Sequence, residues 1–170
     1  MSARKRFTSA AAVAAVLAAP AATVTVGAAF APTAAAQARE TFLPFSPVLR
    51  RCDFSTRQYY DSSGDGRATA TVRSTGGQVS ADVQMAVAEP NATYEVRLIQ
   101  MPRESEAGCH AGAPGTAVAT LRTDGIGGGA VSLSGPRMSG ATGAWVTIER
   151  AQPFSQLPAE FYSTDYVANV

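Results

Sequence analysis

Apolar and polar residues alternate at every second position along several short segments of this chain. The clearest case holds five apolar residues separated by polar or small ones: Val79, Ala81, Val83, Met85 and Val87. A period of two places alternate side chains on the same face of a β-strand. The pattern therefore predicts a strand whose five apolar side chains share one buried face.

Other β-prone segments follow the same scheme. They are residues 54–60, 67–74, 93–100, 116–123, 130–133, 145–150 and 161–167. Gly, Pro, Asn and Asp separate these segments at intervals of roughly 8–12 residues, a spacing typical of β-sandwiches. No helix of ordinary length is predicted after residue 38. We therefore predict an all-β fold, an antiparallel β-sandwich of about seven to eight strands with an immunoglobulin-like arrangement.

Two segments interrupt the regular alternation. Residues 39–51 contain Pro44 and Pro47, and proline cannot donate to a strand ladder. An extended lead-in or an edge strand is expected there, followed by the sandwich domain over residues 52–170. Residues 123–129 contain four glycines. A phosphate-binding loop would lead into a helix, whereas a β-prone segment follows here, so a hairpin is predicted.

The first 38 residues have the composition of a signal peptide. Basic residues at positions 4–6 precede an apolar run at 10–22, and positions 36–38 read Ala-Gln-Ala. This order predicts cleavage before Arg39. The alternative is an uncleaved anchor helix, but Pro20 and nearby polar residues leave the run short of the roughly 20 apolar residues that a membrane span needs. We expect a protein that is secreted or held in the cell envelope, with no integral membrane span in the mature chain.

The composition of the mature chain narrows the range of partners. Removing 38 of the 170 residues leaves 132, the size of one ordinary domain. The mature chain then contains 11 arginines and 13 acidic residues, which gives a formal net charge of −2. This charge gives no electrostatic reason to expect nucleic acid as a partner. Lys5 is the only lysine, so Schiff-base chemistry is excluded from the mature chain.

Cys52 and Cys109 are the only cysteines, and both follow the predicted signal. An even number in an oxidising compartment favours one structural disulfide. With 56 residues between the two cysteines, loop entropy gives about 4 kcal/mol of stabilisation. The alternative is a separate reactive thiol at each position, which no basic cluster supports.

Three parts of the sequence carry a resemblance to known proteins. They are the strand-like segment 94–98, the loop with Cys109, and the segment 121–129, Leu-Arg-Thr-Asp-Gly-Ile-Gly-Gly-Gly. Together they resemble small exported β-sandwich proteins of actinobacteria, many of which have no assigned role. In outline the chain is also similar to superoxide-dismutase-like sandwiches. The metal sites of those proteins need several histidines, and this chain has one, so that activity does not carry over.

A short acidic segment matches the first half of a calcium-binding loop. Asp61, Ser63 and Asp65 have the spacing D-x-S-x-D and precede a glycine. The twelfth position of the loop is Val72, where calcium loops carry a bidentate glutamate. A hairpin turn explains the same residues, and no metal or other cofactor is expected.

Two single residues are candidate functional groups. His110 is the only imidazole, and no nucleophile or third triad member can be paired with it, so a loop histidine is expected. Trp145 alternates with Val146 and Ile148 and is predicted to face away from them. It then serves either core packing or the binding of a partner.

Few side chains of the mature chain suit covalent or metal chemistry, so the leading hypothesis is a non-enzymatic exported domain. It would bind an unidentified extracellular or envelope partner. A hydrolase with an unrecognised site and a purely structural envelope component remain the alternatives.

Overall fold

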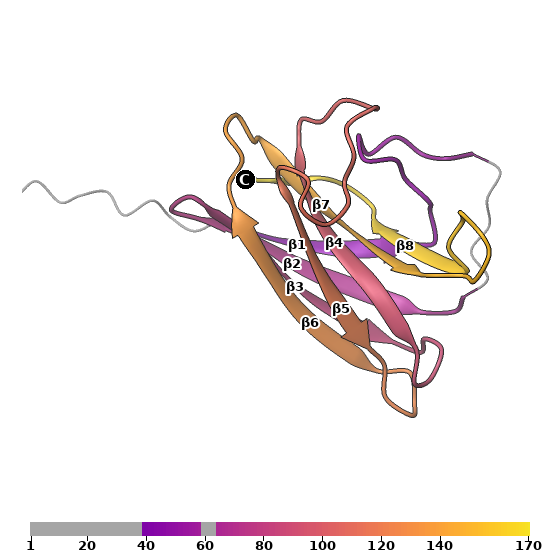
Figure 1. Ribbon diagram of the computed structural model, residues 1–170. Coiled ribbons are helices and arrows are strands. Elements are labelled where there is room, and N and C mark those ends of the chain that lie inside the picture. Colours follow the sequence, from indigo (N-terminus) through magenta and orange to yellow (C-terminus); the bar gives the residue numbers. More distant parts are fainter. Residues whose placement is uncertain (1–38, 59–63) are drawn as a thin grey trace, which may run out of the picture. The chain divides into compact units, whose positions relative to one another are not determined.

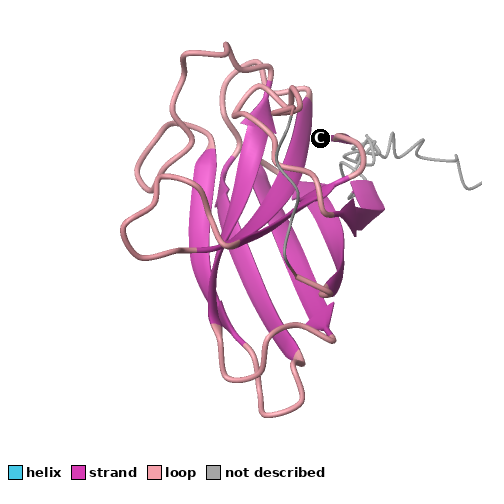
Figure 2. Cartoon of the chain, turned by 90° about the vertical axis from the view of Figure 1, so that its right-hand side faces the viewer, coloured by secondary structure: helices cyan, strands magenta, loops and turns pink. Residues whose placement is uncertain are grey.

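The computed structural model describes residues 39–58 and 64–170. The predicted signal peptide lies outside these residues. The described chain is all-β and antiparallel, as predicted, and Figure 2 shows strands and loops only. Within the described residues no helix is long and apolar enough to cross a membrane. The strands are β1 (Arg39–Ser46), β2 (Arg67–Thr75), β3 (Gln78–Ala86), β4 (Thr93–Met101), β5 (Thr116–Arg122), β6 (Gly129–Pro136), β7 (Gly143–Arg150), β8 (Glu160–Thr164) and β9 (Ala168–Asn169).

The strands form one continuous hydrogen-bonded path, in the order β5-β4-β7-β8-β1-β2-β3-β6, with β9 paired to β7. Its two end strands, β5 and β6, lie side by side in Figure 1. A Cβ atom on Gly135 of β6 would lie 3.6 Å from the Cβ of Ala117 in β5. The described ladders do not include a β5–β6 pair. The sheet therefore folds back on itself, and the predicted immunoglobulin-like sandwich of two separate sheets is not confirmed.

Strand β1 connects the two halves of the sheet. Residues 39–44 pair with β2, and Phe45 and Ser46 pair with β8. Residues 39–46 thus lie inside the sheet, whereas the proline content suggested a lead-in or an edge strand. Pro44 is tolerated because it stands where β1 leaves β2 for β8, and its carbonyl accepts a hydrogen bond from the Asp165 amide at 3.0 Å. A proline costs a ladder donor only where its amide would face a partner strand.

The main core fills the space between the two halves of the sheet. Its largest side chains, all buried, are Leu43, Tyr94, Leu98, Leu121, Ile148 and Tyr162. In β3 the predicted alternation holds from Val79 to Met85, whose apolar side chains are buried. It fails at Val87, which is 66% exposed and has a φ of 57°. The left-handed conformation turns the chain out of the strand, and β3 ends at Ala86.

A second, smaller cluster lies on the outer face of β4 and β7. Ile99, Cys109 and Trp145 are buried there, with Cys52 and Phe54 packed against them. Trp145 faces away from Val146 and Ile148, as predicted, and is 1% exposed. Its ring meets that of Phe54 edge-on, with centroids 5.3 Å apart. The outer face of this half is therefore covered by loops.

Two predicted local structures differ in the folded chain. Residues 54–58 form no strand, and the only pairing there is an isolated bridge between Arg50 and Thr56. Residues 123–128 do turn the chain, but β5 pairs with β4 and β6 pairs with β3. The predicted hairpin is wrong, because the loop crosses from one half of the sheet to the other.

Candidate functional site

Three charged side chains form a compact group on the outer face of β4 and β7. Glu95 stands directly opposite Glu149 in the ladder, a position where like charges repel. Arg97 Nε lies 3.1 Å from Glu95 Oε1, and Arg97 Nη2 contacts Glu149 Oε2. The Arg97 side chain is only 16% exposed. One guanidinium thus compensates two carboxylates and fixes their position, and we call this group the charged floor.

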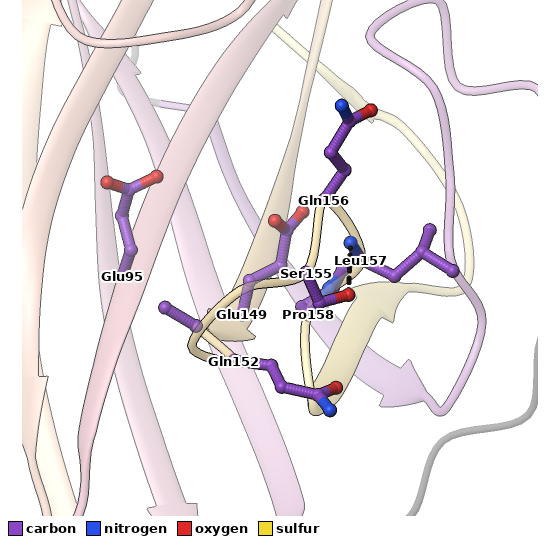
Figure 3. Close-up of a pocket in the computed structure, with 8 residues that line it drawn as sticks. Glu95, Glu149, Gln152, Ser155, Gln156, Leu157 and Pro158 are labelled. Carbon is purple, nitrogen blue, oxygen red and sulfur yellow. Dashed lines mark hydrogen bonds between the residues drawn. The ribbon is translucent and has the colours of Figure 1, made fainter.

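The loop over residues 151–158, which follows β7, stands beside the charged floor. Figure 3 shows Glu95 and Glu149 on their strands next to this loop, with Gln152 and Gln156 projecting from it. The Leu157 amide donates to Ser155 Oγ at 3.0 Å and closes a turn in the loop. The floor and the loop enclose a hollow of about 220 Å³.

A second hollow of about 330 Å³ adjoins the first and shares Glu149, Gln156 and Pro158 with it. Its other wall is the segment 49–57 and the disulfide. Cys52 and Cys109 are bonded, with Cα atoms 5.6 Å apart, so segment 49–57 is tied to the loop over residues 102–114. We call this second space the arginine-lined hollow, because four arginines line it: Arg50, Arg51, Arg57 and Arg97.

The four arginines differ in the interactions that their guanidinium groups make. Arg50 has a structural role. Its Nε donates to Ser163 Oγ at 3.1 Å, and its guanidinium lies 4.0 Å from the ring centre of Phe54. Arg97 belongs to the charged floor. Arg51 and Arg57 are exposed, and neither forms an ion pair within residues 39–58 and 64–170. These two can meet a ligand.

The lining of the arginine-lined hollow is strongly asymmetric in charge. Among the described residues, Glu149 is the only acidic one that lines it, and it is already paired with Arg97. Guanidinium groups bind carboxylate, phosphate and sulfate groups through paired N–H donors. The hollow therefore suits an anionic group.

Asp53 adds a polar connection between the same two loops. Its carboxylate accepts hydrogen bonds from the Ser55 amide at 3.0 Å, the Ser55 hydroxyl at 2.6 Å and the Ser105 hydroxyl. The bond from Ser105 is the largest cause that lowers the pKa of Asp53 to about 2, with Ser55 contributing after it. The charged form of Asp53 thus helps to hold the rim of the hollow.

Replacing Ser105 by alanine is expected to raise the pKa of Asp53 toward the usual value of about 3.9. A depressed pKa in the folded state means that the stabilising bond is complete above the unfolded pKa near 3.9 and is lost as the pH falls toward 2. An NMR titration of the Asp53 carboxyl carbon measures the shift, and Asp124, whose partners are in its own loop, is the internal control. An unchanged Asp53 pKa in Ser105→Ala would contradict the assignment.

Trp145 and His110, named from the sequence, lie apart from the hollow. Trp145 is buried under the disulfide and presents almost no surface to a partner. His110 lines another hollow, formed by the loop 102–114 and Met138, and its Nδ1 lies 2.9 Å from the carbonyl oxygen of Ala111. Neither residue is among those that line the arginine-lined hollow or the hollow over the charged floor.

The calcium-loop residues Asp61 and Ser63 lie outside the described residues. Asp65 is exposed, and its backbone oxygen accepts a bond from Arg67 at 2.8 Å. Val72, at the twelfth position, is buried in the main core, so no ligand can come from there. In the part of the chain that the structure describes, no group of three or more His, Cys, Asp or Glu side chains could hold a metal ion.

In the glycine-rich loop, the carboxylate of Asp124 binds the backbone amides that a phosphate would otherwise bind. Asp124 Oδ1 accepts bonds from the amides of Ile126 at 3.0 Å and Gly128 at 2.8 Å. The bonds from Gly128 and then Ile126 are the main causes that lower the pKa of Asp124. These amides are therefore occupied by the chain itself.

Sequence reasoning did not identify Arg51, Arg57, Arg97 or Glu149 as site residues. Arg97 occupies an ordinary outward position in a strand, and only the ladder register shows that it stands between two carboxylates. Segment 49–57 reaches the hollow because of the disulfide, which the cysteine count did predict. No protein-family model, curated protein or solved structure matches this chain.

Proposed function

We propose that this chain is an exported, non-enzymatic binding domain whose arginine-lined hollow takes an anionic group of a ligand. The observation that carries the proposal is the charge of the lining: of the residues that the structure describes there, Glu149 is the only acid beside four arginines. The disulfide and Asp53 tie the walls together, so little ordering is needed on binding.

Export and family grouping are parts of the same proposal. The disulfide is compatible with an oxidising compartment, and the N-terminal sequence has the order of a signal peptide. A core between two halves of an antiparallel sheet is also the arrangement of a β-sandwich. These features support placement among small exported sandwich proteins of the secreted or envelope compartment.

The hydrolase alternative has less support from the same surface. A serine nucleophile needs a general base, most often histidine, within hydrogen-bond reach. Ser105, which lines the hollow, donates to Asp53, and His110 lines a different hollow. The charged floor holds its two carboxylates on one shared arginine, an arrangement that suits positioning better than proton transfer.

The test uses the exported protein produced from the full chain, with its N-terminus sequenced. Calorimetric titration with an eight-residue aspartate peptide should show saturable binding that weakens as salt is added, and a serine peptide of equal length should not bind. The double variant Arg51→Gln/Arg57→Gln is expected to bind at least tenfold more weakly, because it removes the two exposed guanidinium groups that form no ion pair within the described residues.

The matched control is Arg67→Gln/Arg122→Gln, which removes the same charge from exposed positions on β2 and β5. It should keep the affinity of the unmodified protein. Equal weakening in both double variants, or no binding of the acidic peptide, would reject the hollow as an anion site. If the protein is a purely structural component, the acidic peptide should not bind.

A further inference from the structure

The outer face of β1, β2, β3 and β6 differs from that of the other half. Four outward residues stand in register across the four strands: Phe42 opposite Thr71, Thr71 opposite Asp82, and Asp82 opposite Ser132. Their neighbours in sequence, such as Leu43 and Val83, point into the core. At a strand spacing of about 4.8 Å this row is roughly 14 Å long. We call it the outer row.

The outer row begins with an aromatic side chain. Phe42 is 59% exposed, an unusual state for phenylalanine in the middle of a sheet. Tyr166 lies beside it, half exposed, and its hydroxyl donates to the Phe42 carbonyl at 2.9 Å. Two accessible aromatic residues therefore border one end of the face.

Four polar side chains of this face are bonded to one another. Arg73 Nε lies 3.0 Å from Glu40 Oε2, and the same guanidinium contacts Asp82. The Ser132 hydroxyl donates to Asp82 Oδ1 at 2.5 Å. Their side chains stay partly open to solvent. The face thus offers ordered hydrogen-bonding groups with charges that largely compensate one another.

We propose that this face binds a neutral, extended polysaccharide, with Phe42 stacked on a sugar ring and the outer row bonding to its hydroxyl groups. The apolar face of a sugar ring packs on an aromatic ring. The sugar hydroxyls donate hydrogen bonds to carboxylates, accept them from guanidinium groups, and do both with side-chain hydroxyls. The site is separate from the arginine-lined hollow and extends the binding role to a second class of ligand.

Other occupants fit the chemistry of this face less well. Nucleic acid needs an excess of positive charge, whereas on the outer face of these strands Glu40 and Asp82 balance Arg67 and Arg73. A protein interface has a central apolar anchor surrounded by a polar rim, but Phe42 stands at the end of the row. A neutral ligand rich in hydroxyl groups matches a flat surface of paired charges and small hydroxyl side chains.

The test is native affinity electrophoresis of the exported protein in gels that contain hydroxyethyl cellulose, galactomannan or glycol chitin. At least one polysaccharide should retard the protein, and Phe42→Ala should weaken that affinity at least tenfold. Thr71→Val, which keeps the shape and removes the hydroxyl, should weaken it severalfold. Circular dichroism confirms that both variants remain folded.

Phe154→Ala is the matched control, because Phe154 is a fully exposed phenylalanine on the loop 151–158. It should be retarded like the unmodified protein, as should Arg51→Gln/Arg57→Gln, which separates this site from the hollow. No retardation by any of the three polysaccharides, or equal retardation of Phe42→Ala, overturns the proposal.

Discussion

Replacing Cys52 and Cys109 by serine is expected to lower the free energy of unfolding by about 4 kcal/mol. The disulfide closes a loop across a sequence separation of 57 residues, and the entropy of closing such a loop in the unfolded chain gives this magnitude. For a folded chain of this size the melting temperature should fall by roughly 15 °C. Differential scanning calorimetry of the serine variant and the unmodified protein measures both quantities.

The same variant has a second readout in Trp145. This side chain is buried against Cys109 and Phe54, and the disulfide holds the two loops that cover it. Loss of the bond should loosen this cover before the main core unfolds, so the tryptophan emission should shift to the red below the melting transition. Unmodified protein treated with a reductant should behave like the variant. Identical melting of the oxidised and reduced forms, or two reactive thiols in the purified protein, would contradict the expectation.

The parts of the fold that the sequence predicted are those governed by local alternation. From Val79 to Met85 the apolar residues follow one another at period two because β3 is covered by the core on one side only. The same reason explains β2 and the first half of β4. The cysteine pair was predicted from number and compartment, without any need to know the geometry.

The parts that were missed depend on contacts between distant strands. Pro44 looked like an edge residue, since its sequence does not show that β1 changes partners at that point. Val87 continues the apolar alternation, and only the turn to a φ of 57° removes it from the core. Local pattern gives the direction of a side chain, but not which strand lies beside it.

The two proposed binding surfaces illustrate the same limit. Arg97 becomes a site residue because β4 pairs with β7 in a register that places Glu95 opposite Glu149. Phe42 becomes a residue of the second proposed site because Leu43 takes the inward position. The larger aromatic ring then faces outward beside Thr71. Neither fact can be read from composition or motif, and both follow directly from register.

The largest effect of a single substitution is expected at Glu160, a buried carboxylate that joins three elements. Oε1 accepts from Arg150 Nη2 at 2.7 Å, and Oε2 accepts from the Tyr94 hydroxyl at 2.7 Å. The Tyr162 hydroxyl lies 3.4 Å from the same oxygen and accepts a bond from the Gly66 amide at 3.0 Å. The network connects β8 with β7, β4 and the start of β2.

The pKa values of its neighbours show how strongly these groups interact. Burial and then the bond to Glu160 raise the pKa of Tyr94, which keeps its hydroxyl protonated as a donor. Burial is the largest single effect on Arg150 and would lower its pKa, but the hydrogen bond and charge of Glu160 raise it, together with Tyr94 and Glu89, and the net pKa is raised. Both effects favour a charged Arg150 and a neutral Tyr94 as donors to Glu160.

Glu160→Ala is therefore expected to lower the free energy of unfolding by about 3 kcal/mol, because it leaves the Arg150 charge and the Tyr94 hydroxyl without their acceptor. This is the low end of the range for a broken buried pair, since the Arg150 side chain is still 31% exposed. Glu160→Gln should cost less, because an amide oxygen still accepts from Tyr94. Urea unfolding followed by circular dichroism measures the three proteins.

A matched control and a double-mutant cycle separate the network from a general loss of charge. Glu106→Ala removes an exposed carboxylate and should change the stability by less than about 0.5 kcal/mol. Arg150→Ala should destabilise the unmodified protein clearly and the Glu160→Ala variant little, since its partner is already gone. The coupling energy should then be about 1–3 kcal/mol. Additive losses, or equal effects at Glu106 and Glu160, would show that the carboxylate does not join these elements energetically.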